Sequence, residues 1–414
     1  MRLLFLTNFY PPFSRGGYEQ WCQEVAEKLR NQGHEVMVLT SRYGRDQLET
    51  PKPKWICRDL HLEMEFASLR NSIRFFTSRK TREKENLARL RQLIEDFRPD
   101  RILIWGMWNL PRSLPALAEK LNPDRVAYYM GDYWPTLPSQ YEFYWQAPAR
   151  HWAAAGPKYL LGSIARRMLA QEEKPVLKFA HVMLPTAFMR DELKRKGIFF
   201  QETKIIYGAI DTRRYLSHNS PKSSSNGSLS LLYVGRLTAD KGVHTAIEAL
   251  DKLVHQYNMR NLKLVIVGTG NFDYENHLHR LVQEKDLASF VTFLGTHPPE
   301  AMPELYRQAD IFLFTSIWPE PFGRVLVEAM ASGVAVIGAA SGGAVEIMIN
   351  NENALVFPPG NAEALAAQIT RLAESPSLLQ RLTKTGRQTA REKFDIRRMA
   401  EGIEAYLKAM ENKR

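Results

Sequence analysis

Short apolar runs alternate with longer amphipathic stretches along almost the whole chain. The apolar runs predict strands buried on both faces, and they lie at residues 2–9, 35–41, 101–108, 125–134, 230–235, 263–267, 290–294, 310–315, 334–338 and 354–357. Apolar positions at helical spacing predict intervening helices, of which residues 18–31 and 70–98 are the clearest in the first half. Strand–helix alternation is typical of a parallel sheet with helices on both faces. The pattern therefore predicts an α/β chain built from doubly wound, Rossmann-like sheets.

A polar segment rich in Ser, Asn and Pro, residues 217–228, interrupts this alternation and has the composition of a linker. The strand–helix pattern starts again after it, and 414 residues are enough for two domains. We therefore expect an N-terminal domain over residues 1–210, a linker over 211–228 and a C-terminal domain over 229–394. Residues 395–414 are predicted to form a terminal helix.

The most informative segment is TSIWPEPFGRVLVEAMASGVAVIGAASGGAVE, residues 315–346. It predicts the end of a strand, a Pro-rich turn, a helix that begins at Phe322 or Gly323, a second strand and a Gly-rich loop. Glu320 lies in the turn and Glu328 within the helix. Carboxylates accept hydrogen bonds from sugar hydroxyls, and turn amides at a helix N-terminus suit a phosphate. The segment predicts a nucleotide-sugar site, although either glutamate alone would more often be a solvated surface residue.

Two cations follow another predicted strand, in LYVGRLTADKG at residues 232–242. Arg236 offers a planar fork of donors and Lys241 a compact charge. Breaking a sugar–phosphate bond leaves negative charge on a diphosphate, which such cations would stabilise. Singly, each would more often be solvated, but their placement beside glycines at a strand end predicts phosphate binding. This region contains no Asp-x-Asp pair, so we expect no bridging metal.

Glycines at two further strand ends are candidates for close backbone approach. Gly268 lies in a Gly-Thr-Gly turn after a strand, which we interpret as tight packing near a nucleoside. Gly16 and Gly17 follow the first strand, where the missing Cβ lets the backbone approach a ligand. A pair of glycines is also common in ordinary turns, so this signal is weak by itself.

Charge and cysteine content narrow the class of protein. The net charge is +11, and residues 1–210 hold 33 Lys and Arg against 23 Asp and Glu, so almost all of the excess lies in the first half. This suits an anionic partner there, such as a membrane surface, a lipid phosphate or an acidic polysaccharide, and a generally basic solvated surface is the alternative. No nucleic-acid recognition motif is present. Two cysteines in a chain without an 18-residue apolar run favour a reducing, cytoplasmic setting, with the inner membrane face as an open alternative.

The spacing of Glu320 and Glu328, with Pro-Phe-Gly after the first and Ala-x-x-x-Gly after the second, resembles the signature of retaining glycosyltransferases of family four. The resemblance extends to YVGRLTADKGVHTAIEAL (233–250), LVIVGTG (264–270), LYRQADIFLFTS (305–316) and PPFSRGGYE (11–19). It covers nearly the whole chain and is strongest in the second half. It implies the GT-B architecture, two Rossmann-like domains facing across a cleft, with the terminal helix packed back on the first domain.

The resemblance also implies roles for individual residues. It places the departing diphosphate on Arg236 and Lys241, the ribose hydroxyls on Glu328, and the donor sugar and phosphate on Glu320 and the amides of Phe322 and Gly323. It places the nucleoside near Gly268, with a base edge at Gly295 and Thr296, and a loop lining the cleft at Gly16 and Gly17. Asp132 is implied as a further catalytic residue, and Glu19, Tyr133 and Trp134 are candidates for contact with the acceptor.

The chain departs from the family pattern at two strand ends in the first half. Members often carry histidine in these turns, but here the turns read Trp105-Gly106-Met107 and Met130-Gly131-Asp132. This indicates either a subgroup that works without an imidazole or a weakened enzyme. Two alternatives to an active transferase follow: a nucleotide-sugar-binding partner protein, and a sugar-nucleotide epimerase, for which no supporting His or carboxylate pair occurs.

Residues 133–175 are unusually aromatic and then basic, and three interpretations stay open. Rings in this segment stack well on sugars, so they are candidates for an acceptor platform; they are Trp134, Tyr141, Phe143, Tyr144, Trp145, Trp152 and Tyr159. Residues 159–167 would alternatively form a basic amphipathic helix at a bilayer. The third interpretation is a flap that packs its aromatic residues inside.

Together these observations predict a retaining, metal-independent glycosyltransferase of the hexosyl type. We expect a UDP- or GDP-sugar as donor, no further cofactor, and a glycan or lipid-linked acceptor, as in polysaccharide biosynthesis. The basic first half would make peripheral contact with an anionic membrane, and nucleic acid is not an expected partner. The base, the sugar and the linkage depend on contacts that look alike in one dimension.

Overall fold

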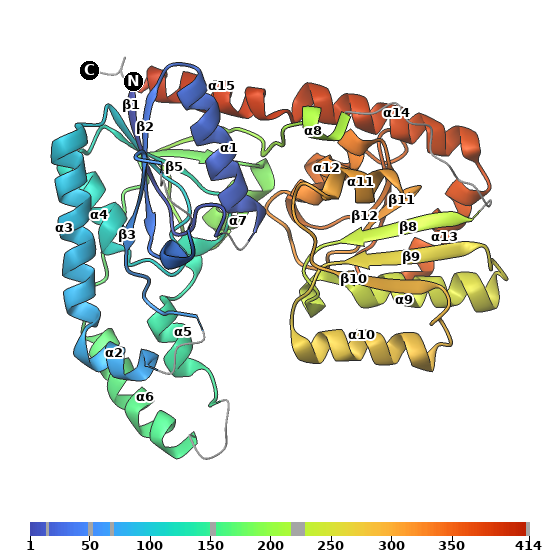
Figure 1. Cartoon of the computed structure of the whole chain (residues 1–414), viewed down its shortest axis with the longest axis horizontal. Helices are drawn as coiled ribbons and strands as arrows, with labels where there is room; N and C mark the ends of the chain where they lie inside the picture. Colours follow the sequence, from blue (N-terminus) through green and yellow to red (C-terminus); the bar gives the residue numbers. More distant parts are fainter. Residues whose placement is uncertain (14–15, 49–52, 67–69, 150–154, 217–227, 411–414) are drawn as a thin grey trace. The chain divides into compact units, whose positions relative to one another are not determined.

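The computed structural model describes residues 1–13, 16–48, 53–66, 70–149, 155–216 and 228–410 (Figure 1). The chain divides into two compact units. Unit 1 comprises Met1–Pro185, Arg190–Ile206 and the C-terminal residues from Ala400 on; unit 2 comprises Thr186–Met189 and Tyr207–Met399. The chain therefore changes unit after Ile206, ahead of the linker expected over 211–228, of which residues 217–227 lie outside the described residues.

Within the described residues, unit 1 holds a seven-stranded parallel sheet in the order β3-β2-β1-β4-β5-β6-β7. Its strands are β1 (Arg2–Leu6), β2 (Glu35–Ser41), β3 (Ile56–Leu60), β4 (Arg101–Ile104), β5 (Val126–Tyr129), β6 (His181–Leu184) and β7 (Glu202–Ile205). The helices of the first half are α1 (Gly17–Asn31), α2 (Asn71–Thr77), α3 (Arg79–Phe97), α4 (Ser113–Leu121), α5 (Gln140–Gln146), α6 (Ala155–Ala170) and α7 (Ala187–Arg195).

In the part of the chain that the structure describes, unit 2 holds a six-stranded parallel sheet in the order β10-β9-β8-β11-β12-β13. Its strands are β8 (Leu229–Val234), β9 (Leu262–Val267), β10 (Val291–Gly295), β11 (Ile311–Phe314), β12 (Ala335–Ala339) and β13 (Leu355–Phe357). The helices are α8 (Arg213–Leu216), α9 (Val243–Asp251), α10 (Phe272–Glu284), α11 (Met302–Arg307), α12 (Arg324–Ser332), α13 (Ala362–Ala373), α14 (Pro376–Lys393) and α15 (Ile396–Ala409), whose last residues belong to unit 1.

Both sheets are doubly wound, as the alternation of strands and helices predicts. The strand order reverses between β1 and β4 in unit 1 and between β8 and β11 in unit 2. Central strands are apolar throughout because helices cover both of their faces; for example, Leu3, Leu4 and Phe5 of β1 have no exposed surface. Ligands of such sheets bind beyond the carboxyl ends of the strands on either side of the reversal.

The predicted elements differ from the structure in several places. No strand was predicted at β7, whose sequence ETKI is mostly polar. The strands expected over 101–108 and 125–134 end at Ile104 and Tyr129, and the buried residues that follow them form loops. The helix expected over 70–98 is two helices, α2 and α3, which meet at Ser78, a residue with a non-helical φ of −128°. Strand β3 was not expected, because its sequence ICRDL contains two charged residues and no continuous apolar run.

The insert helices, α2, α5 and α6, extend unit 1 beyond the carboxyl ends of its strands (Figure 1). They share a small core of their own, made of Phe75, Trp145, Ala165 and Leu169. Phe75 and Trp145 pack edge to face at 5.5 Å between ring centroids. No helix among the described residues is both long and apolar enough to cross a bilayer.

Candidate functional site

Two loops meet beyond the carboxyl ends of β8 and β11, where the strand order of unit 2 reverses. The backbone N–H groups of Ile317 and Trp318 donate to the Asp240 carbonyl at 2.9 and 3.0 Å. The Thr315 hydroxyl donates to the Lys241 carbonyl at 2.9 Å. These bonds fix the loop after β11 against the short 3₁₀ turn after β8 (Ala239–Lys241).

The joined loops bring Lys241 and Glu320 into an ion pair. The Ser316 hydroxyl donates to the same carboxylate oxygen, Glu320 Oε1, at 2.9 Å. Each side chain of the pair is only 15% exposed, so the charges interact in a medium that screens them less than bulk water does. The structure therefore places a cation, a carboxylate and a hydroxyl side by side at the position where this fold binds ligands. Ser316 was not among the expected residues, although a hydroxyl directly after a strand at a predicted site is a usable signal.

Glycines allow the loops of this edge to approach one another. Gly268 has a φ of +132°, and a Cβ added there would lie 1.9 Å from the Gly235 carbonyl oxygen. Gly242 has a φ of +64°, and its Cβ would lie 2.3 Å from the Thr315 carbonyl oxygen. Both contacts are with backbone atoms that side-chain rearrangement cannot move. The tight packing expected at Gly268 is therefore present.

Helix α12 begins beside Glu320. Gly323 precedes its first residue with a φ of +113°, and Phe322 is buried against Phe394 with ring centroids 5.6 Å apart. Glu328 lies in the middle of the helix and is 7% exposed. The Tyr306 hydroxyl donates to its Oε2 at 3.0 Å, and Arg324 Nε donates to its Oε1 at 3.0 Å. Both carboxylate oxygens thus have protein partners, and binding of ribose hydroxyls there stays a prediction.

The remaining donor-side residues are on the surface of unit 2. Arg236 is exposed, and within the described residues its guanidinium makes no ion pair. Thr296 is exposed too, and its hydroxyl lies 2.9 Å from that of Thr269. Gly295 has a φ of +70° with open space beside it. The side chains of Arg236 and Thr296 and the backbone of Gly295 are available to a ligand, but the structure does not assign them one.

The corresponding edge of unit 1 is aromatic. Tyr18, in the first turn of α1, stacks on Trp105 at 5.8 Å, and Trp105 stacks on Tyr129 at 4.5 Å. The Tyr18 hydroxyl donates to the Tyr129 carbonyl. Burial, together with the negative charge of Asp132, raises the pKa of the Tyr18 phenol well above its usual range. Tyr18 was not among the expected residues.

Tyr18 also accounts for the missing side chain at position 131. A Cβ added at Gly131 would lie 2.6 Å from two carbon atoms of the Tyr18 ring. A Cβ at Gly106, in the other turn that lacks histidine, would lie 2.5 Å from Asn8 Oδ1 and 3.4 Å from the Tyr18 ring. The tyrosine ring therefore occupies the space that a side chain at position 131 would need, whereas at position 106 the obstacle is the Asn8 side chain.

Two carboxyl groups lie near this ring. Burial raises the pKa of Asp132 to about 7; the Trp134 N–H, which donates to Asp132 Oδ1 at 3.2 Å, lowers it, and the negative charge of Glu19 raises it. Glu19 is 7% exposed and lies in the first turn of α1. The expected residues Glu19 and Asp132 are thus close enough for the charge of Glu19 to raise the pKa of Asp132. With a pKa of about 7, the Asp132 carboxyl changes its protonation state near neutral pH.

Other expected residues of unit 1 are less suited to a direct role. Gly16 is extended, with a φ of −173°, a conformation that any residue adopts, and Gly17 is the first residue of α1. Tyr133 and Trp134 are 4% and 3% exposed, and Trp134 packs edge to face on Phe179 at 6.0 Å. Contact of these rings with an acceptor stays a prediction.

The aromatic insert is divided between core and surface. Trp145 is buried in the insert core, whereas Phe143 and Tyr159 are 60% and 76% exposed. Trp152 lies outside the described residues. Neither a continuous aromatic platform nor a fully packed flap describes this arrangement.

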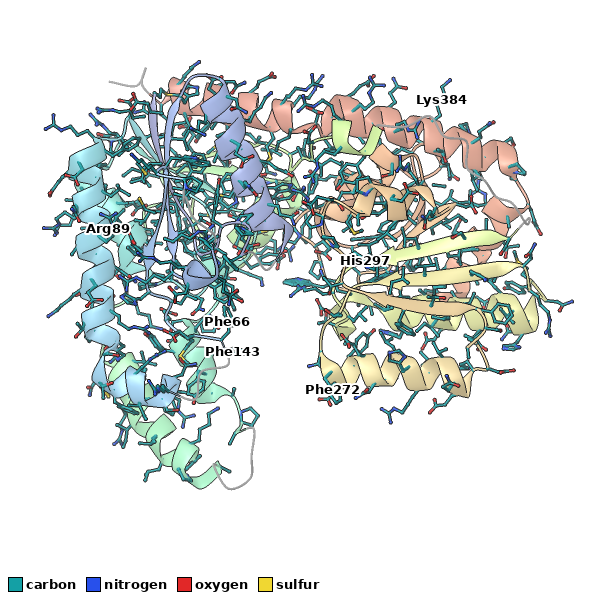
Figure 2. All side chains as sticks on the ribbon, in the orientation of Figure 1. Phe66, Arg89, Phe143, Phe272, His297 and Lys384 are labelled. Atoms are coloured by element: carbon teal, nitrogen blue, oxygen red, sulfur yellow. The ribbon has the colours of Figure 1, made fainter. Side chains whose placement is uncertain are left out.

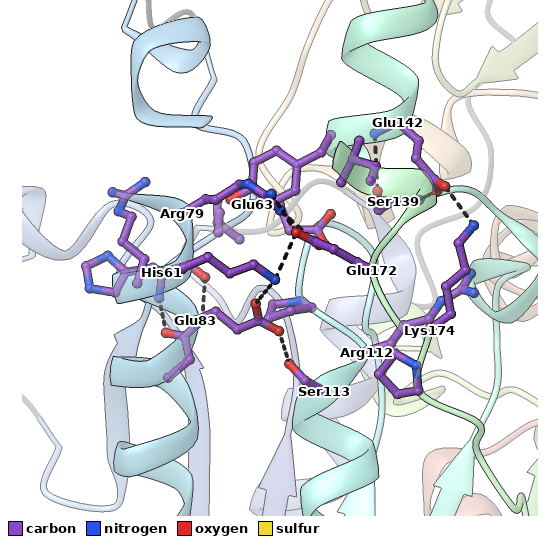
Figure 3. Close-up of a pocket in the computed structure, with 18 of the residues that line it drawn as sticks. His61, Glu63, Arg79, Glu83, Arg112, Ser113, Ser139, Glu142, Glu172 and Lys174 are labelled. Carbon is purple, nitrogen blue, oxygen red and sulfur yellow. Dashed lines mark hydrogen bonds and ion pairs between the residues drawn. The ribbon is translucent and has the colours of Figure 1, made fainter. Parts of the chain in front are cut away.

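A polar cavity of about 260 Å³ lies between α3 and the insert helices. Of the expected residues, it is lined by Tyr141, a candidate for the acceptor platform. Figure 3 shows its ion pairs: Arg79 donates to Glu172 through both terminal nitrogens at 2.9 and 2.5 Å, and Lys174 donates to Glu142 at 2.8 Å. Glu63 also lines the cavity, and burial raises the pKa of its carboxyl to about 7. Most of these charges neutralise one another. The ion pair of Arg79 with Glu172 joins α3 to the segment after α6 and so holds the insert against α3.

Two doubly wound Rossmann-like units, one with a paired cation and carboxylate at its strand reversal, define the class of GT-B glycosyltransferases. The family comparisons agree. Residues 15–214 match the family model described as Glycosyltransferase Family 4, and residues 218–389 match that described as Glycosyl transferases group 1. The chain belongs to the group 1, family 4 glycosyltransferases.

Three curated relatives are similar to this chain over all or about half of its length. A glycogen synthase of Mycobacterium tuberculosis is 26% identical over 100% of this chain and 96% of its own length. Spore coat protein SA of Bacillus subtilis is 29% identical over 49% of this chain. An uncharacterized glycosyltransferase of Methanocaldococcus jannaschii is 32% identical over 44% of it. These last two matches span 57% and 45% of the relatives' own lengths, about half.

Solved structures show the same fold over the full chain. Anabaena HepE in complex with UDP has a TM-score of 0.71 at 20% identity, covering 99% of this chain and 100% of that one. Sucrose-phosphate synthase of Thermosynechococcus elongatus has a TM-score of 0.72 at 18% identity, covering 100% of each chain. At these identities the likeness concerns the fold alone.

Proposed function

We propose that this protein transfers a sugar from a nucleotide-sugar donor to an acceptor, with retention of anomeric configuration. The observation that carries the proposal is the meeting of Lys241, Glu320 and Ser316 at the strand reversal of unit 2. Family membership supports it, as does the UDP bound by a protein of the same fold. In this proposal unit 2 holds the donor and unit 1 the acceptor.

Lys241 and Arg236 would carry the charge of the departing diphosphate. Lys241 is already desolvated by its pairing, so part of the cost of removing it from water is met before a ligand arrives. Arg236 adds a second cation that is exposed in unit 2. Glu320 and Ser316 would then hold hydroxyls of the donor sugar, since a carboxylate accepts and a hydroxyl both donates and accepts.

We further propose a hexosyl donor carried by UDP or GDP, a reaction that proceeds without a metal, and a glycan or lipid-linked acceptor. The protein cations just named would do the electrostatic work of a metal at the diphosphate. The basic first half would meet an anionic membrane on the cytoplasmic side. The requirement for a metal is tested by measuring the transfer rate with and without a chelator, and we expect the same rate in both.

The first experiment measures thermal stability against UDP-, GDP- and ADP-sugars. A donor at a hundred times its Kd stabilises a protein by about 2.7 kcal/mol. We expect a shift with one donor class, and its loss in the Arg236→Ala Lys241→Ala double variant. The matched control is Arg260→Ala Lys263→Ala, which removes the same charge from exposed positions before and at the start of β9. An equal loss in the control, or a full shift in the first variant, would contradict the proposed site.

Transfer itself is then measured with the donor so identified and a panel of glycan and lipid-linked acceptors. We expect a product whose anomeric proton coupling matches that of the donor sugar. Donor binding without transfer to any acceptor would instead support a nucleotide-sugar-binding partner protein. A product of inverted configuration would contradict the retaining reaction while leaving the donor site in place.

A further inference from the structure

Helix α6 is held to unit 1 by a narrow stripe. Gly162, Ala165 and Leu169 are its buried residues, and they recur at the spacing of a single helix face. A Cβ at Gly162 would lie 3.4 Å from the Trp145 carbonyl oxygen, so the helix backbone packs directly on α5. At least half of the helix circumference therefore faces away from the protein, at the end of the insert farthest from the sheet (Figure 1).

The exposed side of α6 is apolar where a surface helix is usually polar. Leu160, Leu161 and Ile164 are 65%, 38% and 47% exposed. Helical spacing places Leu160 and Ile164 opposite the buried stripe and Leu161 next to them, nearer the stripe. Tyr159 adds a fourth large exposed side chain, on the side of Leu160 away from Leu161. We name these four residues the α6 face. On α5, Phe143 is exposed nearby in the insert, as Figure 2 shows.

The charge of α6 has one sign. Ala155–Ala170 contains Lys158, Arg166 and Arg167 but no Asp or Glu. Within the described residues, the guanidinium groups of Arg166 and Arg167 make no ion pair, and both side chains are exposed. A partner of α6 must therefore offer apolar surface and negative charge together.

We propose that the α6 face docks on a lipid bilayer that contains anionic lipids. Such a surface provides both requirements at once: acyl chains for the leucines and isoleucine, and phosphate headgroups for the arginines. A second copy of the protein fits less well, because symmetrical pairing of α6 with α6 would bring basic residues against basic residues. The helix would lie in the interface plane.

This inference assigns the membrane contact of the proposed function to one helix face. Its biological role rests on the proposed function, the transfer of a sugar to a lipid-linked acceptor. A lipid-linked acceptor is confined to the membrane surface. Docking through the insert of unit 1 would bring the acceptor-binding unit to that surface. The enzyme would then find its acceptor by diffusing along the membrane instead of through the surrounding solution. Binding to vesicles requires neither donor nor acceptor, so it can be tested independently of catalysis.

The test is co-sedimentation of the full chain with vesicles of phosphatidylcholine alone or with about 30 mol% phosphatidylglycerol. We expect binding to the anionic vesicles and at least tenfold weaker binding to the neutral ones. The Leu160→Glu Ile164→Glu variant should lower the partition coefficient at least tenfold, because it removes apolar contact and adds charge opposite in sign to the helix. The Arg166→Gln Arg167→Gln variant should lower it roughly thirtyfold, at about five- to sixfold per cation.

The matched control is Phe272→Glu, which changes a large apolar residue that is 75% exposed, at the start of α10 (Figure 2). We expect it to bind as the unchanged protein does. All variants should keep the donor-induced thermal shift, which shows that they are folded and separates this test from that of the proposed function.

Three outcomes would overturn the proposal. The first is that the unchanged protein binds neither kind of vesicle. The second is that the Leu160→Glu Ile164→Glu variant binds as tightly as the unchanged protein, which would place the membrane contact elsewhere on the basic half. The third is a concentration-dependent dimer that the same variant converts to monomer, which would assign the α6 face to a second copy of the chain.

Discussion

The same doubly wound topology ends in two different chemical surfaces in units 1 and 2. Beyond β8 and β11 the loops carry paired charges, Lys241 with Glu320, fixed by backbone hydrogen bonds. Beyond β1 and β4 the space is filled by stacked rings, Tyr18 on Trp105, with Asp132 close to them. Topology therefore determines where a site lies, and the side chains placed there determine what it does.

Glycine serves the two edges in different ways. At Gly268 the missing Cβ lets backbone approach backbone, whereas at Gly131 it makes room for the ring of Tyr18. A backbone obstacle cannot be removed by a second substitution, but a side-chain obstacle can. This difference can be measured.

The largest effect is expected for Gly268→Ala. The added Cβ meets a carbonyl oxygen at 1.9 Å in a backbone conformation that L-residues rarely adopt, so the free energy of unfolding should fall by about 3 kcal/mol or more. Calorimetry would show a Tm lower by roughly 6 °C or more, together with loss of the donor-induced shift.

Gly295→Ala is the control for backbone conformation alone. Its φ of +70° is also positive, but no atom lies within 4 Å of the added Cβ, so the cost should be only about 1 kcal/mol. Equal costs for the two substitutions would show that the loops after β8 and β9 are not in close contact.

A smaller and conditional effect is expected for Gly131→Ala. In the unchanged protein, the added Cβ meets the Tyr18 ring at 2.6 Å, and overpacking of this kind costs about 2 kcal/mol. In a Tyr18→Ala background, the same substitution should cost less than about 0.5 kcal/mol, because the obstacle is gone. A double-mutant cycle by denaturant unfolding measures the difference. The same cost in both backgrounds would exclude the ring as the reason for glycine at this position.

The last effect is a pH dependence at the edge of unit 1. The pKa of Asp132 is about 7 in the folded protein, above the value of about 3.9 for an unfolded chain, so the folded state holds this proton more tightly. The stability that this difference provides is fully present below about pH 4 and is lost as the pH rises to about 7. Asp132→Asn should therefore become more stable relative to the unchanged protein as the pH rises from 5 to about 7.

Thermal unfolding at a series of pH values in this range measures the effect. Glu63 titrates in the same window, but it does so in both proteins and cancels from the comparison. Parallel curves for the two proteins would show that Asp132 is ionised throughout this range.

Much of the fold follows from local pattern. All six strands of unit 2 lie where their apolar runs predict them, and Glu35–Ser41 coincides with the run at 35–41. Strand β3 could not be predicted in this way, because Arg58 and Asp59 interrupt it and its position is fixed by pairing with β2. The break at Ser78 could not be predicted either, because it too depends on tertiary packing: α2 turns away from α3 and packs Phe75 in the insert core.

The two strand–helix series, the family signature and the residue types at the strand ends can all be read from the amino-acid sequence. These are local properties, set by the periodicity of apolar residues and by short motifs. The folded structure was needed to show that Lys241 pairs with Glu320, that Tyr18 fills the space beside Gly131, and that Leu160 and Ile164 face outward. Each depends on contacts between segments far apart in the chain, or on their absence, and periodicity along the sequence carries no information about which segments meet.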